Sequence, residues 1–347
     1  MASGIGGAGG RGFAAELRDA VTLRAALLVV GVLLLQLGFI VSYVGALHHP
    51  YPHRAALAVV APPEASDQVV GQLNALPKQV LDARAVTDEA AARQQIRDQK
   101  VYAALLIEPA GTRDTMLVAS ASGPALSTAM QQIITGVERS QGRTVVVEDV
   151  VPLDPGDAEG LTSFYLAVGW CVGGYLVASI LGISAGARPA NRKRAVIRLG
   201  TLALYSVAAG IGGTLIVVPI LHALPGNVWA LWGVGTLVVF GVGAVTMALE
   251  CLFDVVGIGL AVLLFVVLGN PSAGGVFPPP LMPPFWRVIG PWLPNGAGTS
   301  AARSIAYFDG TAMTGPLLVL AGWAVVGVVV SLVVTSIRPR GGRPALP

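Results

Sequence analysis

Residues 23–47 read LRAALLVVGVLLLQLGFIVSYVGAL, and Arg24 is the only charged side chain in this stretch. About 20 apolar residues are enough for a helix to cross the roughly 30 Å hydrocarbon core of a bilayer. The stretch is too long for the core of a signal peptide and lacks a small-residue cleavage site after a short core. We therefore predict a retained membrane helix over 23–47.

Five further apolar stretches follow and predict membrane helices over 163–186, 199–221, 228–249, 255–269 and 316–337. The composition agrees, since 54% of the chain is hydrophobic and 12% is charged, about half the charge of an average soluble domain. This balance excludes a soluble enzyme, a disordered chain and a disulfide scaffold. Cys171 and Cys251 both lie in apolar runs, so we expect neither a disulfide nor a structural zinc site.

The basic residues predict the orientation. Half of the 22 Lys and Arg residues fall in three short segments that a six-span topology places on one side: Arg11, Arg18, Arg24, Arg188, Arg192, Lys193, Arg194, Arg198, Arg338, Arg340 and Arg343. Positive residues favour the cytoplasmic side, so we expect a plasma-membrane protein with both termini in the cytoplasm. Glu250 and Asp254 then lie in a cytoplasmic turn without a positive charge, and we expect them in a solvated turn rather than a proton relay.

Residues 48–161 have the composition of a soluble domain, with more acids than bases. Strand-like stretches cover 55–61, 80–86, 101–107, 115–120 and 144–151. Helical patterns cover 88–99, with Thr87 as N-cap, and 124–141. The expected fold class is a polytopic α-helical membrane protein with six transmembrane helices and an α/β or α+β extracytoplasmic domain between the first and second. The predicted parts are 1–22 (tail and interfacial helix), 23–47, 48–161, 162–337 (five-helix bundle) and 338–347 (tail).

No catalytic set stands out in the extracytoplasmic domain. His48, His49 and His53 cluster beside two prolines and are typical of a polar linker at the membrane interface rather than of a metal site. Ser127 and Ser140 lie in no GxSxG motif. We expect no catalytic, cofactor-binding or metal-binding residues.

Two basic elements are expected at the cytoplasmic side. Residues 11–24 place Phe13 and Leu17 on one helical face and Arg18 on the other, as in a helix that lies along the membrane surface; the alternative is a disordered tail. The loop 188–198 carries five positive charges that suit anionic headgroups or a cytoplasmic partner, and charge alone does not separate these two.

The segment 270–315 contains too much Pro and Gly for a continuous span. Irregular backbone near a bilayer persists only where protein or a wet cavity satisfies its polar groups, and Phe and Trp are typical of membrane interfaces. We predict a re-entrant or interfacial structure on the outer side, packed over the bundle. Its candidate gate residues are Asn270, Pro271, Gly274, Gly275, Phe277, Pro278, Phe285, Trp286, Pro291, Trp292 and Pro294.

The layout of one span, a large external domain and five further spans resembles the membrane subunits of ABC type-2 exporters, in particular the branch of the YhgE/Pip (phage infection protein) family. Three local patterns carry the resemblance: AAARQQIRDQKVYAALLIEP at 90–109, the start of the second span at 164–174, and the Gly-Gly-x-Phe-Pro, Pro-Phe-Trp and Pro-x-Leu-Pro elements of 270–297. It extends over most of the chain from about residue 20.

The resemblance implies a homodimer or heterodimer of permease subunits that exports an amphiphilic, lipid or envelope substrate. It also implies a separate cytoplasmic ATP-binding subunit, contacted by Phe13, Leu17, Arg18, Arg188, Arg192, Lys193, Arg194 and Arg198. The chain has no GxxxxGK[ST] phosphate loop, so ATP would act through that partner and the chain is not itself expected to be an enzyme. Membrane lipids are the other expected partners, and we expect no binding of nucleic acid. The alternative is a non-transporting envelope receptor or scaffold that displays the acidic domain.

Overall fold

The computed structural model describes residues 22–337. Within these residues, six helical stretches are long and apolar enough to cross a membrane, which confirms the predicted number and indicates a membrane protein. They are α2 (Leu23–Leu47), α6 (Thr162–Ala185), α7 (Arg192–Leu215, continued by a wider turn to Ile220), α8 (Val228–Phe253), α9 (Val255–Val262, continued through Leu263–Leu268 into α10, Gly269–Ser272) and α13 (Thr314–Ile337).

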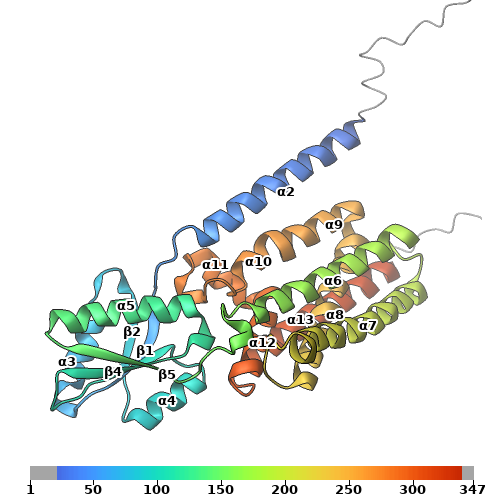
Figure 1. The fold of residues 1–347 in the computed structure, drawn as a ribbon. Coiled ribbons are helices and arrows are strands. Elements are labelled where there is room, and N and C mark those ends of the chain that lie inside the picture. Colours follow the sequence, from blue (N-terminus) through green and yellow to red (C-terminus); the bar gives the residue numbers. More distant parts are fainter. Residues whose placement is uncertain (1–21, 338–347) are drawn as a thin grey trace, which may run out of the picture.

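The bundle is arranged around α8, which packs against α6, α7 and α13. Glycines allow these helices to approach closely: a Cβ on Gly174 of α6 would lie 2.6 Å from the Val239 carbonyl oxygen of α8. In contrast, α2 lies beside α9 and α10 and leaves most of its apolar side chains exposed (Figure 1). One contact is the hydrogen bond that the Ser42 hydroxyl donates to the Val267 carbonyl.

The helix α7 starts earlier than the apolar pattern predicted. Asn191 caps it, with Oδ1 accepting from the Arg194 N–H at 3.0 Å. The predicted basic loop 188–198 is therefore largely the first two turns of a continuous helix. The sequence pattern missed this start because charged residues at the end of a span carry no hydropathy signal.

Between α2 and α6 the chain forms the sheet domain (residues 51–161), with a five-stranded sheet of order β2-β1-β3-β4-β5. Only the β3–β4 pair is antiparallel. The strands are β1 (Ala55–Val60), β2 (Leu81–Ala85), β3 (Ala103–Leu106), β4 (Arg113–Val118) and β5 (Thr144–Asp149), each within two residues of its predicted ends.

Helices cover both faces of this sheet (Figure 1). On one face, α3 (Pro63–Asn74) and α5 (Pro124–Ser140) pack on alternate residues of β1 such as Leu57. On the other, α4 (Glu89–Arg97) packs through Ile96, together with Phe308 from the membrane half. The sequence analysis did not predict α3, and it named the wrong N-cap for α4, because Asp88 rather than Thr87 accepts the Ala91 N–H, at 2.8 Å.

Candidate functional site

The segment between α10 and α13 turns back into the bundle instead of crossing it. After the short helix α11 (Pro284–Ile289), helix α12 (Pro294–Tyr307) lies against α6, α8 and α13 at the end of the bundle that contacts the sheet domain (Figure 1). Glycine permits this close approach, since a Cβ on Gly298 would lie 3.1 Å from Cγ2 of Val238 on α8 and 3.3 Å from Cβ of Ala167 on α6. A re-entrant or interfacial structure packed over the bundle was predicted, and the structure shows the packing on the bundle, beside the sheet domain. We refer to residues 273–313, between α10 and α13, as the re-entrant segment after that prediction.

Polar side chains hold the start of this segment. The buried Asn295 amide donates to the Phe265 carbonyl at 2.9 Å and to Oδ1 of Asn270 at 2.7 Å. The Trp323 indole N–H of α13 donates to the Trp292 carbonyl at 2.8 Å. These bonds satisfy backbone groups that an irregular segment leaves open in an apolar environment.

The C-terminal end of α12 is hydrogen-bonded to the segment that leads from the sheet domain into α6. The buried guanidinium of Arg303 donates to the carbonyls of Gly274 at 3.1 Å and Gly160 at 3.3 Å. Burial lowers the pKa of Arg303 below its usual value. The Tyr307 hydroxyl donates to Asp157 at 2.7 Å. Burial first, and this bond second, raise the pKa of Tyr307.

A second set of bonds joins α4 to the loop after α12. The Gln99 amide donates to the Ser304 hydroxyl at 3.2 Å, and the Thr311 hydroxyl donates to the Arg97 carbonyl at 3.0 Å. The sheet domain and the re-entrant segment are therefore joined by several hydrogen bonds, and the Phe308 ring packs at the contact between them.

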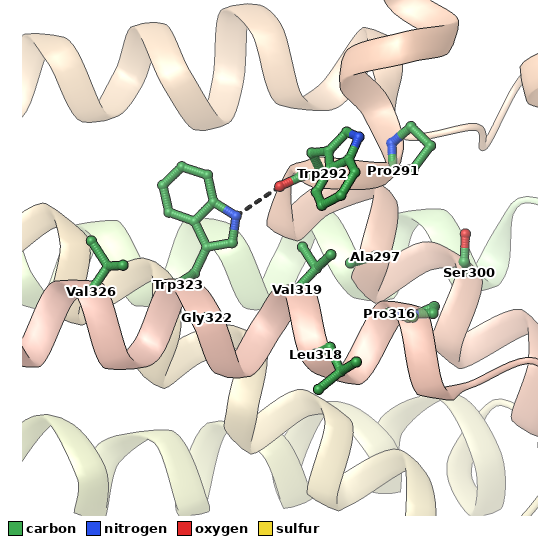
Figure 2. A pocket seen from close by; sticks show the side chains of 11 residues that line it. Pro291, Trp292, Ala297, Ser300, Pro316, Leu318, Val319, Gly322, Trp323 and Val326 are labelled. Atoms are coloured by element: carbon green, nitrogen blue, oxygen red, sulfur yellow. Dashed lines mark hydrogen bonds between the residues drawn. The ribbon is translucent and has the colours of Figure 1, made fainter.

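An apolar pocket of about 820 Å³ lies between this segment and α13 (Figure 2). Its volume is in the range of small-molecule sites, about 300–1,000 Å³. Its lining is almost wholly apolar and consists of Pro291, Trp292, Ala297, Ser300, Gly315, Pro316, Leu318, Val319, Gly322, Trp323 and Val326. Leu318 and Val326 are exposed, so the pocket opens on the side surface of the bundle.

The structure distributes the predicted gate residues over several places. Pro291 and Trp292 line the pocket. Others support the segment from within: Asn270 accepts from Asn295, Pro294 is buried at the start of α12, and Gly275 abuts the Phe164 ring, to which a Cβ there would approach within 2.2 Å.

Pro271 and Gly274 belong to the turn after α10; Pro271 is buried, and the Gly274 carbonyl accepts from Arg303. Pro278 packs on Gly123 of the sheet domain. The eleven residues therefore do not form one gate, and the pocket takes most of its other walls from α13, which the sequence analysis did not single out.

The four aromatic residues among the predicted gate residues, Phe277, Phe285, Trp286 and Trp292, fall into an exposed pair and a pair covered by protein. Phe285 is 57% exposed and Trp292 is 69% exposed, as expected of side chains at a membrane interface. Trp286 is instead buried against Ala46 of α2, and Phe277 packs against the cores of the sheet domain and of this contact. The expectation fails for these two because the protein, rather than the bilayer, covers their rings.

The opposite end of the bundle holds the predicted basic residues. Arg188 donates to the Cys251 carbonyl at 2.9 Å, and Arg198 donates to the carbonyls of Gly186 and Ala185 at 2.8 and 2.7 Å. These two side chains therefore fasten the ends of α6, α7 and α8 to one another.

Three other members of the set, Arg192, Lys193 and Arg194, are exposed on the first turn of α7. Within residues 22–337 these three make no ion pair within 4.0 Å. Phe13, Leu17 and Arg18 lie outside the described residues.

Glu250 corrects the sequence analysis. The side chain is 1% exposed within α8 rather than in a solvated turn, and it fills the space left by Gly182 of α6, where a Cβ would lie 2.1 Å from Oε2. Arg198 lies close enough to interact with it electrostatically. The helix continues past the apolar run to Phe253, and Arg198 of α7 supplies the positive charge that the local sequence lacks.

Asp157, Arg303, Tyr307 and Trp323 are the functional candidates that sequence reasoning missed. A single Arg within the small-residue run 294–306 was the available signal for Arg303. Tyr307 and Asp157 lie 150 positions apart, and no local pattern connects them. Comparisons of the chain with protein-family models, curated proteins and solved structures found no match.

Proposed function

We propose that this chain is the membrane-spanning permease subunit of an ATP-driven exporter of the ABC type, which moves an amphiphilic, lipid or cell-envelope substrate outward. The observation that supports this best is the apolar pocket between the re-entrant segment and α13. It opens sideways among exposed apolar residues, where the acyl chain of a membrane amphiphile can enter without crossing water.

The arrangement around the pocket also favours transport. One wall is α13 and the other is the re-entrant segment, which is hydrogen-bonded through Arg303 and Tyr307 to the sheet-domain side. In the proposed topology the sheet domain is extracytoplasmic, so the pocket lies at the depth of the outer leaflet. A displacement of the sheet domain would then move one wall of the pocket against the other.

The energy source in this proposal is a separate ATP-binding subunit, because the chain carries no phosphate loop. The proposed docking surface comprises Arg192, Lys193 and Arg194, which are exposed at the end of the bundle away from the sheet domain. Exposed positive charges at a helix N-terminus oppose the helix dipole, so an anionic surface that covers them would stabilise this turn. The uncovered apolar face of α2 supports a second permease copy in the same assembly.

The first test is to isolate the full chain from native membranes in mild detergent. Identification of co-purified proteins by mass spectrometry and an ATPase assay should give a stoichiometric nucleotide-binding subunit with vanadate-sensitive activity. Recovery of the chain alone, or with envelope proteins only, under conditions that preserve a control transporter would contradict the proposal and favour the receptor or scaffold.

The pocket is tested with two glycine variants of the isolated complex after its reconstitution into lipid vesicles. Gly322 lines the pocket and Gly233 lies on α8 outside it, and a Cβ at either would meet no atom within 4 Å. Gly322→Trp should reduce outward movement of a fluorescent lipid at least about tenfold, because the indole fills the pocket. Gly233→Trp should leave transport unchanged, and equal rates for both variants would remove the pocket from the substrate path.

A further inference from the structure

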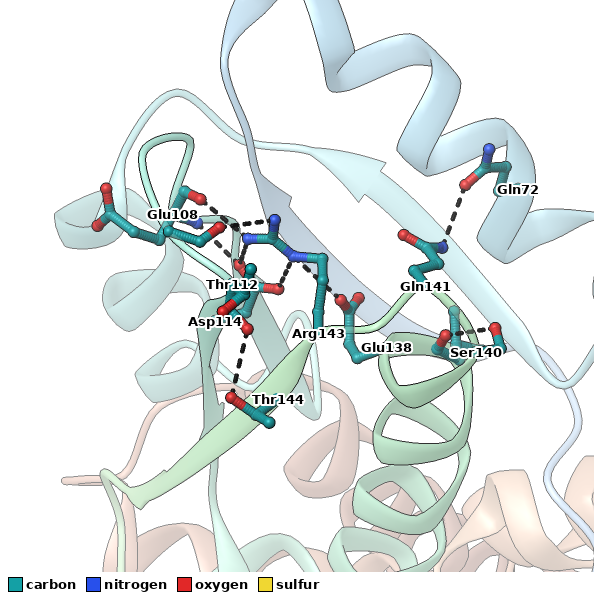
Figure 3. A network of polar contacts seen from close by, with 11 residues as sticks. Gln72, Glu108, Thr112, Asp114, Glu138, Ser140, Gln141, Arg143 and Thr144 are labelled. Atoms are coloured by element: carbon teal, nitrogen blue, oxygen red, sulfur yellow. Dashed lines mark hydrogen bonds and ion pairs between the residues drawn. The ribbon is translucent and has the colours of Figure 1, made fainter.

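A small cavity of about 120 Å³ lies at the end of the sheet domain away from the bundle, between α3, α5 and the start of β5 (Figure 3). Its apolar walls are Val69, Leu73, Ile107 and Val137. The carboxyl group of Glu138 belongs to the same lining, and this side chain is 3% exposed.

One carboxyl oxygen of Glu138 lacks a donor. Among the described residues, Oε2 has no hydrogen-bond partner, and the Nε of Arg143 is 3.6 Å away. A buried acceptor without a donor destabilises a folded protein. A donor that enters the cavity would remove this destabilisation.

Arg143 also lines the cavity and forms an ion pair with Glu138, but it directs its hydrogen bonds elsewhere (Figure 3). Its Nε and Nη2 donate to the two carboxylate oxygens of Asp114, both at 2.5 Å. Its remaining bonds go to the carbonyls of Gly111 and Glu108, both at 2.9 Å. Arg143 therefore forms its close ion pair with Asp114, and Glu138 shares the same guanidinium only through the longer contact of 3.6 Å with Nε.

The raised pKa of Glu138 agrees with the burial of its carboxyl group beside Asp114. Burial, and then the neighbouring Asp114, raise the pKa of Glu138 to about 7. Burial also acts on Asp114, but its bonds with Arg143 hold the pKa of that carboxyl below its usual value. The Glu108 carboxyl adds a further negative charge near Arg143, whereas α3 contributes the uncharged Gln72.

We propose that this cavity binds a small organic cation, an ammonium group on a short apolar stem, with Glu138 as its counter-ion. The ammonium group donates to Oε2 and the stem contacts the apolar walls. The exposed amides of Gln72 and Gln141, which are 3.5 Å apart, lie beside the carboxyl group and offer further acceptors. A volume of 120 Å³ corresponds to about four water molecules at roughly 30 Å³ each, enough for an ammonium group with a stem of about four carbons.

Two other observations favour an organic cation. Among the described residues no group of three or more His, Cys, Asp or Glu side chains is placed to hold a metal ion. The sheet domain is acidic overall, which raises the local concentration of cations. When the ligand binds at acidic pH, the Glu138 carboxyl releases its proton to solvent, and the positive charge of the ammonium group takes the place of that proton.

The test is isothermal titration of the purified full chain with n-butylammonium chloride, in two buffers of different ionisation enthalpy. We expect saturable binding with release of close to one proton at pH 6. The affinity should rise about tenfold per pH unit between pH 5 and 6 and become constant above about pH 7, the pKa of Glu138. Titration with n-butanol should give no binding, since it carries no charge.

Two variants and one control complete the test. Glu138→Gln keeps the volume, removes the charge and should weaken binding at least about tenfold. Val69→Phe fills the cavity and should do the same while Glu138 is retained. Glu64→Gln removes an exposed acid of α3 and should change nothing. Absence of saturable binding to the folded wild-type chain, or equal binding by Glu138→Gln, would overturn the proposal.

Discussion

The hydroxyl of Tyr307 on α12 donates a 2.7 Å hydrogen bond to Asp157, which precedes α6 by a few residues. Oδ1 of the same carboxylate accepts from the Thr162 backbone N–H at 2.9 Å and from its hydroxyl at 2.6 Å. One buried carboxylate thus joins the exit of the sheet domain, the start of α6 and the end of the re-entrant helix. This carboxylate is one of several direct links between the two halves of the molecule, beside the backbone bond from His53 to Pro280.

Tyr307→Phe should loosen this link. Removal of the hydroxyl leaves a buried carboxylate oxygen without its donor, which costs about 1–3 kcal/mol. We expect a lower unfolding temperature in detergent and faster proteolysis of residues 150–160. Tyr165→Phe is the control, because that ring is exposed on α6. If both variants unfold at the same temperature as the wild type, the bond contributes nothing to stability.

A methyl group on Gly235 should disrupt the centre of the bundle. The Trp170 ring lies against this glycine of α8, and a Cβ there would be 2.4 Å from ring atoms Cε2 and Cζ2. Overpacking of a core costs about 1–3 kcal/mol, so Gly235→Ala should lower the unfolding temperature. Gly233→Ala, two residues away with no atom within 4 Å of its Cβ, should be neutral or slightly stabilising.

Glu138 should make the stability of the sheet domain depend on pH in the absence of ligand. The folded carboxyl keeps its proton up to about pH 7, whereas an unfolded glutamate loses it near pH 4.5. The folded state therefore binds more protons between these values, and stability falls as pH rises from about 4.5 to 7. A shift of this size corresponds to about 3 kcal/mol.

Hydrogen exchange of β4 and β5 amides, corrected for the intrinsic pH dependence of exchange, measures this effect. Protection in the wild type should decrease across the window, and Glu138→Gln should flatten the dependence. An unchanged slope in the variant would assign the pH dependence to other groups.

Charge reversal of the exposed basic turn should uncouple the proposed transporter. The triple variant Arg192→Glu, Lys193→Glu and Arg194→Glu places acids at the N-terminus of α7, where the helix dipole favours them. The chain should therefore fold, whereas stimulation of the partner ATPase should fall at least about tenfold because like charges now face each other. Arg113→Glu, at the exposed first residue of β4 in the sheet domain, is the control. Undiminished stimulation in the triple variant would remove this surface from the coupling.

Much of the architecture could be predicted from local patterns. The six apolar stretches and the five strands occupy nearly their predicted residues, because spans and strands follow from continuous apolar runs and β-branched segments. The errors fall where hydropathy has no signal. They include the polar helix Pro63–Asn74 and the charged start of α7 at Arg192.

Of the two walls of the pocket, only the one formed by the re-entrant segment could be predicted from the sequence. Pro and Gly density identified the re-entrant segment, and two of its predicted residues, Pro291 and Trp292, line the pocket. The facing wall comes from α13, whose apolar sequence reads like any other membrane helix. Which side of such a helix faces a pocket depends on its rotation against its neighbours, and packing rather than composition sets that rotation.

By itself the sequence determined that residues 22–337 contain six helices long and apolar enough to cross a membrane, an acidic sheet domain between the first two, and a Pro- and Gly-rich segment before the last. These properties follow from the length and polarity of contiguous segments. Only the tertiary structure decided that Arg303 and Tyr307 fasten α12 to the sheet-domain side, that Glu250 is buried against Gly182, and that Glu138 faces a cavity with an unpaired oxygen. Each of these depends on residues from distant parts of the chain, and only packing brings them within hydrogen-bond or van der Waals distance.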